Sequence, residues 1–78
     1  MQNNYFKSSD LNLCSFIISS GYCISSTEKN KDNTTVFYII RDDNLDRLIE
    51  LYFSHQAKVD PILFAYNQKL LKTRIYHS

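Results

Sequence analysis

The hydrophobic pattern of the chain is densest between residues 34 and 40, in the run TTVFYII. β-Branched and aromatic side chains of this kind fit the pleated surface of a strand. The alternation of strand side chains divides the run into two faces, one with Val36, Tyr38 and Ile40 and the other with Phe37 and Ile39. Both faces are apolar, so we expect helices on both, or helices on one face and a partner chain on the other.

A helical pattern precedes this strand between residues 11 and 18. Its apolar positions recur at helical spacing, at Leu11, Cys14, Ile17 and Ile18, widened by Leu13 and Phe16. Ser8-Ser9-Asp10 predicts the start of the helix, with a hydroxyl as cap and Asp10 in the first turn. Gly21, the one glycine of the chain, predicts its end, because a glycine adopts the left-handed conformation that closes many helices.

Residues 22–28 are predicted to form a first strand. One face of it carries Tyr22, Ile24 and Ser26, and the other carries the small residues Cys23, Ser25 and Thr27. A face this small and polar indicates an edge strand or a strand with one solvated side. The charged, Asn-rich stretch at 28–33 is then a hairpin loop with a mobile tip.

Two further helices are predicted after the central strand. The first has the strongest helical spacing in the chain, at Leu45, Leu48, Ile49, Tyr52 and Phe53. Asp43 or Asn44 is expected to cap it. Asp60-Pro61 opens the last helix, with aspartate as cap and proline at the first helical position.

These elements predict one small α+β domain over residues 1–78, in the order α-β-β-α-α. A two-stranded antiparallel hairpin packs on three helices, and residues 1–7 form a partly ordered tail held by Tyr5 and Phe6. A chain of this length buries only about 60% of its unfolded surface. A small core and a strand that is apolar on both sides favour self-association, as a homodimer or a higher oligomer. The residues that we expect at this contact are Val36, Phe37, Tyr38, Ile39 and Ile40.

The charge and composition narrow the class of protein. A net charge of +1 creates no strong field for nucleic acid or a membrane. No apolar run approaches the roughly 20 residues of a membrane span. The polar start of the chain lacks a basic-then-apolar leader, so we expect a cytoplasmic protein without membrane contact. Abundant Asn, Lys, Ile, Tyr and Phe, all with AT-rich codons, indicate an AT-rich genome, that of a low-GC bacterium, an archaeon or one of their viruses.

The side chains able to carry chemistry form no recognisable catalytic set. Cys14 falls on the apolar stripe of a helix, which favours a buried, inert thiol. No cationic residue adjoins Cys23 in the sequence to lower the pKa of its thiol. His55 and His77 have no cysteine or carboxylate at a spacing that would indicate a catalytic pair, so we assign them to surface or turn positions. We therefore expect no enzyme, no cofactor and no metal site. Capping and a solvated helix face account for the acidic residues Asp42, Asp43, Asp46 and Glu50.

The C-terminal third is basic. Residues 58–78 contain one anionic residue, Asp60, and four cationic residues, which are Lys58, Lys69, Lys72 and Arg74. They are candidates for phosphate contacts, with Tyr66 or Tyr76 stacking on bases. The low net charge argues against this function, and the preference of a helix C-terminus for cations explains three of the four. Nucleic acid is therefore a possible partner but the less favoured one.

Short motifs along nearly the whole chain resemble a family. They are Phe6-Lys7-Ser8-Ser9-Asp10-Leu11, Gly21-Tyr22, Val36-Phe37, Leu48-Ile49, Tyr52-Phe53, Ala57-Lys58-Val59-Asp60-Pro61, Leu71-Lys72 and Ile75-Tyr76. The family consists of small domains of unknown function from bacteria, archaea and their phages and mobile elements. Its members begin with F-K-[TS]-x-D-L and contain a V-D-[PA] turn. The resemblance implies the architecture and a viral or mobile-element context, with no function to carry over. Cys14, Cys23 and the longer, more charged hairpin loop depart from the pattern.

The expected function is that of a small non-enzymatic protein-interaction module. Tyr- and Phe-rich patches suit protein interfaces, and the opposite charges of residues 42–50 and 58–78 favour contact between copies. Besides itself, a host protein is a possible partner. By analogy with phage accessory proteins, the module would act by binding that partner in the host cytoplasm. The alternative is a nucleic-acid-binding accessory protein that uses the basic C-terminal helix.

Overall fold

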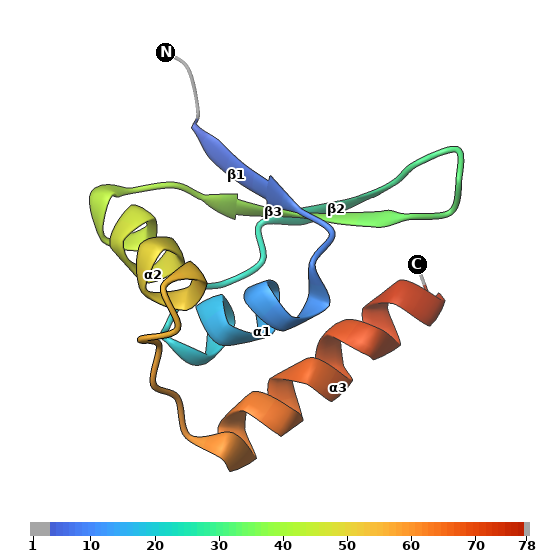
Figure 1. The fold of residues 1–78 in the computed structure, drawn as a ribbon. Coiled ribbons are helices and arrows are strands. Elements are labelled where there is room, and N and C mark those ends of the chain that lie inside the picture. The colour runs from blue at the N-terminus through green and yellow to red at the C-terminus, as the bar shows by residue number, and fades with distance from the viewer. Residues whose placement is uncertain (1–3, 78) are drawn as a thin grey trace.

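The computed structural model describes residues 4–77 as a three-stranded sheet lying over three helices (Figure 1). In chain order the elements are β1 (Tyr5–Ser8), α1 (Leu11–Ser19), β2 (Ser26–Lys29), β3 (Thr35–Ile40), α2 (Asp43–Phe53) and α3 (Pro61–His77). α1 lies beneath the sheet and packs between α2 and α3. The predicted α+β class is confirmed, and the order of elements is β-α-β-β-α-α.

The sheet has the order β1-β3-β2 with both pairs antiparallel, so β3 is its central strand. The prediction of a two-stranded hairpin is wrong, because residues 5–8 of the predicted tail form β1 and pair with residues 37–40. With β2 as its sole neighbour, β3 would leave the N–H and C=O groups of its second edge unpaired. Four residues make too short an apolar pattern to indicate this strand from sequence. Residues 1–3 of the predicted tail lie outside the described residues.

The predicted strand over residues 22–28 is shorter and displaced, because β2 begins at Ser26. Ile24 packs into the core, and Thr27 lies opposite the buried Phe37. Residues three apart cannot share one face of a regular strand. The regular alternation is interrupted at Ser25. Its N–H donates to the carbonyl of Tyr38 at 2.7 Å, and Ser26 also pairs with Tyr38, so two residues stand opposite one. The alternation therefore restarts at β2, as in a β-bulge.

The two faces of β3 have different surroundings. Thr35, Phe37 and Ile39 point toward the helices and are 5%, 0% and 1% exposed. On the other face Val36 and Tyr38 are half-buried, and Ile40 is 63% exposed. The division of the strand into two faces is confirmed, and the helices cover one of them (Figure 1).

α1 begins and ends through local hydrogen bonds. Asp10 is its cap, since its Oδ1 accepts from the N–H of Leu13 at 3.1 Å, and the prediction of a hydroxyl cap is wrong. The hydroxyl of Ser8 instead accepts from the N–H of Asp10 at 3.0 Å. At the other end Gly21 has φ +107°, and its N–H donates to the carbonyl of Ile18 at 3.2 Å. The predicted glycine stop is thus confirmed.

The contact between α1 and α3 includes polar side chains of both helices. The hydroxyls of Ser15 and Ser19 fold back onto backbone carbonyls of α1, each at 2.7 Å. Asn67 of α3 donates to the Ser19 hydroxyl at 2.8 Å, and Gln68 donates to Asn12 at 2.6 Å. Apolar side chains of α3 add to this contact, since Leu71 is buried in the core and Phe64 and Ile75 pack against it.

The two later helices start near their predicted positions. Asp42, one residue before the predicted caps Asp43 and Asn44, caps α2 by accepting from the N–H of Leu45 at 2.8 Å. The same carboxylate accepts from the Tyr22 hydroxyl at 2.6 Å, which explains why this position is preferred. Pro61 is the first residue of α3, and Asp60 Oδ1 accepts from the N–H of Ile62 at 3.0 Å, so that start is confirmed.

Thr35 provides a test of the buried face of the sheet. Within residues 4–77, its hydroxyl is the one buried side-chain oxygen or nitrogen without a hydrogen-bond partner. Thr35→Val removes this oxygen and keeps the side-chain shape, so we expect stabilisation by about 1 kcal/mol and a rise in Tm of about 4–8 °C. Thr27→Val, at the half-buried inward position of β2, is the matched control and should change the Tm little. An unchanged or lower Tm for Thr35→Val in thermal unfolding would contradict this expectation.

Candidate functional site

The outward side of the sheet is the first candidate surface, and we call it the open face. Strand pairing sets Tyr5 opposite Ile40, Lys7 opposite Tyr38, Ser26 opposite Tyr38 and Glu28 opposite Val36. These alternate positions point away from the helices. The open face therefore consists of Tyr5, Lys7, Ser26, Glu28, Val36, Tyr38 and Ile40.

Tyr38 lies at the centre of the open face and is held by its neighbours. Tyr5 meets its ring edge to face, with 6.0 Å between the ring centroids. The Nζ of Lys7 lies 5.4 Å from the centre of the Tyr38 ring, within the range of a cation–π contact. The Tyr38 hydroxyl donates to Glu28 Oε1 at 2.7 Å, and this bond to a carboxylate raises the pKa of Tyr38. A tyrosine without a helix above it is thus kept in one orientation.

The sequence-predicted contact residues divide between the two faces of β3. Val36, Tyr38 and Ile40 lie on the open face, whereas Phe37 and Ile39 are buried under it and cannot reach a partner in this fold. The structure adds Tyr5, Lys7 and Glu28 to the surface. Sequence reasoning missed the first two because residues 5–8 carry too short a pattern to predict a strand. Once β1 is paired with β3, the alternation of side chains along β1 places Tyr5 and Lys7 on the open face.

A second apolar surface lies along α3, on the side turned away from α1. Ile62 and Tyr76 are each 80% exposed, and Tyr66 lies between them at 60%. Lys69 joins Ile62 and Tyr66 in lining a shallow hollow of about 410 Å³. We call this surface the outer face of α3. Within residues 4–77 no helix is both long and apolar enough to cross a membrane.

The candidate basic residues do not form one cluster. Lys58 lies in the connection between α2 and α3, and the other three lie on α3. Lys69 belongs to the outer face of α3, whereas Arg74 lines a groove on the opposite side of the helix. At about 100° per residue, Lys72 and Arg74 are separated by about 200° around the axis. Lys69 and Lys72, three residues apart, are the pair that can act together.

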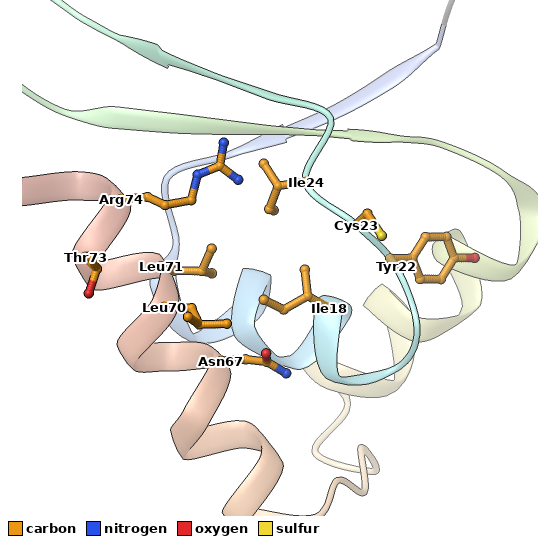
Figure 2. Close-up of a pocket in the computed structure, with 9 residues that line it drawn as sticks. All are labelled: Ile18, Tyr22, Cys23, Ile24, Asn67, Leu70, Leu71, Thr73 and Arg74. Atoms are coloured by element: carbon orange, nitrogen blue, oxygen red, sulfur yellow. The ribbon is translucent and has the colours of Figure 1, made fainter. Parts of the chain in front are cut away.

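The groove beside Arg74 is an open, mainly apolar hollow lined by residues of α1, α3 and the segment between α1 and β2 (Figure 2). It has a volume of about 440 Å³ and lies between α3 and the segment that leads from α1 to β2. Its walls are mainly apolar and come from Ile18, Tyr22, Ile24, Leu70 and Leu71. Polar groups from Asn67 and Arg74 border it on the α3 side, and Cys23 lies on the opposite rim.

The other chemical candidates lie apart from these surfaces or serve local structure. Cys14 is fully buried, and desolvation raises the pKa of its thiol to about 11. His55 closes α2 with φ +61°, a left-handed turn position, and the side chain of His77 lies outside the described part of the chain. Asp42 caps α2, and Asp46 pairs with Arg41 at 2.9 Å. Among the described residues, no three His, Cys, Asp or Glu side chains gather as metal ligands.

Comparison with known proteins places the chain in a family without assigning an activity. A family model described as a domain of unknown function, DUF5659, matches residues 3–77, which is nearly the whole chain. Searches of curated proteins and of solved structures give no match.

The two cysteines should differ in reactivity. Cys23 is exposed and Cys14 is buried, so one thiol per native chain should react rapidly with a thiol reagent and the second should react after unfolding. The folded-state pKa of Cys14, about 11, lies above its ordinary value of 9.0. The stability linked to this thiol is therefore present below pH 9 and is lost as the pH rises toward 11. Urea unfolding between these pH values measures the loss, with Cys14→Ala as the variant that lacks it. Two fast thiols in the native chain would contradict the assignment.

Proposed function

We propose that this chain, which belongs to the DUF5659 family, is a small non-enzymatic protein-interaction module that associates with a second copy of itself. The observation that carries the proposal is the open face of the sheet. Its central strand keeps Val36, Tyr38 and Ile40 outside the core, and the last of these is 63% exposed. An apolar sheet face of this kind is stabilised when a second sheet packs on it.

The charges of the open face favour a second copy as the occupant. Lys7 on β1 lies opposite Tyr38 and Glu28 on β2 lies opposite Val36, so the two charges stand on opposite edges of the face and two residues apart along β3. A two-fold axis parallel to β3 brings β1 of one copy over β2 of the other, which places each Lys7 within two residues of a Glu28 along the strand. One cation and one anion, placed on opposite edges of the face, are the arrangement that such self-complementary packing requires.

The dispersal of reactive groups supports a function without catalysis. Cys14 is held as a thiol by burial, and its Sγ lies 3.9 Å from the carbonyl of Ser8. His55 serves as the left-handed residue that ends α2. A nucleophile, a base that activates it and an oxyanion donor are needed together for acyl transfer. The residues considered for these roles are spread over α1, the α1–β2 segment and the end of α2.

We extend the proposal to a cytoplasmic protein encoded by a phage or another mobile element and active against a host partner. The abundance of Asn, Lys, Ile, Tyr and Phe, whose codons are AT-rich, supports such a source. Small accessory proteins of this kind act by binding and blocking a partner, and that step is an analogy.

A pair of matched substitutions tests self-association. Ile40→Glu places a charge on the open face, and Ile62→Glu places the same charge on the outer face of α3, where the isoleucine is 80% exposed. We expect a light-scattering mass of twice 9.2 kDa for the wild type and for Ile62→Glu. Ile40→Glu should be monomeric at about 200 µM, because dimerisation would desolvate two carboxylates. Circular dichroism verifies that both variants remain folded.

Two results would end the self-association proposal. One is a monomeric wild type at that concentration. The other is dissociation by Ile62→Glu but not by Ile40→Glu, which would move the interface to the outer face of α3.

Binding of nucleic acid is the second candidate function, favoured by the composition of α3. This helix contains no acidic residue and exposes Tyr66 and Tyr76 near Lys69 and Lys72. If α3 binds single strands, a gel-shift assay at low salt should give a complex that Lys69→Gln weakens. Lys29→Gln, on β2, is the control. We expect no shift with DNA or RNA at about 50 µM protein, and a salt-sensitive complex would favour this second function instead.

A further inference from the structure

The groove between α3 and residues 22–24 has the features of a peptide site (Figure 2). Its volume of about 440 Å³ falls within the range of ligand sites in proteins. We propose that it binds a short segment of a partner protein, one that carries apolar side chains next to a single carboxylate. This inference rests on the proposed function as a partner-binding module, and it adds the place of binding and the chemistry that is recognised.

The walls of the groove select apolar side chains. Ile18 at the end of α1 and Ile24 in the segment before β2 are half-buried, so each presents part of its side chain to the groove. Leu70 borders the groove from α3 and is 45% exposed. Figure 2 shows Leu70 directed from α3 toward Ile18 across the hollow. A ligand side chain placed among these three residues would be surrounded by hydrocarbon.

Arg74 selects the charge of the ligand. Its side chain extends from α3 toward Ile24, at the upper end of the groove in Figure 2. In the part of the chain that the structure describes, the Arg74 side chain makes no ion pair or hydrogen bond, and α3 itself contains no acidic residue. A guanidinium binds a carboxylate through two parallel hydrogen bonds. The complementary ligand therefore carries an acidic side chain or a chain terminus beside its apolar residues.

The backbone beside the groove indicates a peptide rather than a lipid or another apolar small molecule. Within residues 4–77, the N–H and C=O groups of Cys23 and Ile24 make no backbone hydrogen bond. The neighbouring amides are satisfied, since Tyr22 N–H donates to Ile17 at 3.4 Å and Ser25 N–H donates to Tyr38 at 2.7 Å. A peptide brings donors and acceptors that pair with the two free residues, as in strand addition, and a lipid tail brings neither.

Cys23 provides a way to test the site in the native protein, because it is an exposed free thiol on the rim of the groove. Two disulfide probes carry the tripeptides Leu-Leu-Asp and Leu-Leu-Lys on the same 3-mercaptopropionyl linker, each amidated at its C-terminus so that the aspartate supplies the single carboxylate. Thiol–disulfide exchange joins a probe to Cys23 and releases the other half of the probe as a thiol. Intact-mass spectrometry at rising concentrations of β-mercaptoethanol then measures how strongly each probe is retained.

We expect the acidic probe to survive at least about ten-fold more reductant than the basic probe. Arg74→Gln should reduce this difference to less than about two-fold, whereas Lys72→Gln should leave it unchanged, because Lys72 is a cation on another side of the same helix. Leu70→Ser should lower the retention of both probes. Circular dichroism again confirms that the variants fold.

Several results would overturn the proposal. They are equal retention of the two probes, the same loss in Lys72→Gln as in Arg74→Gln, and no retention of either probe. A change of oligomer mass in Arg74→Glu would show that the groove is occupied by a second copy and would also overturn it. Light scattering of Ile40→Glu reports separately on the open face, so failure of the groove and failure of self-association are distinguishable.

Discussion

The burial of α1 governs how the sheet and the other two helices are arranged. Five consecutive residues of this nine-residue helix, 13–17, are buried, so every side of it needs cover. The inner face of β3 supplies cover through Phe37 and Ile39, α2 supplies it through Leu45, and α3 through Leu71. A chain of 78 residues buries only part of its apolar side chains, because a small domain has a large surface for its volume. The outward sides of the sheet and of α3 consequently remain uncovered.

The way in which α3 contacts α1 explains why apolar side chains lie on the surface. The contact is built from the hydrogen bonds Asn67–Ser19 and Gln68–Asn12 as well as from Leu71. Polar pairing on the inner side of α3 leaves Ile62 and Tyr76 on its outer side. The helix therefore lacks the single apolar stripe of an ordinary surface helix. Such a helix is suited to a protein that completes its apolar contacts with a partner.

The segment between α1 and β2 connects the fold to the candidate peptide site. Tyr22 donates to Asp42, the cap of α2, and thereby anchors the segment against the far helix. Ser25 then bonds to β3, and Cys23 and Ile24 lie between these two attachments. Because the segment is fixed at both ends yet unpaired in the middle, it forms one wall of a groove and does not extend the sheet. The same irregularity that shortens β2 therefore creates the surface that we assign to a partner.

Local sequence signals were enough to predict the three helices, the Gly21 stop, the Pro61 start and the two faces of residues 35–40. The strand at Tyr5–Ser8 follows from tertiary packing, because a four-residue edge strand is stabilised by the backbone groups of β3 rather than by its own pattern. The tertiary structure also separated Arg74 from Lys69 and placed it beside Ile24, which is distant in the chain. Periodicity reports which side chains share a face, whereas the partner of that face is set by how the elements pack together.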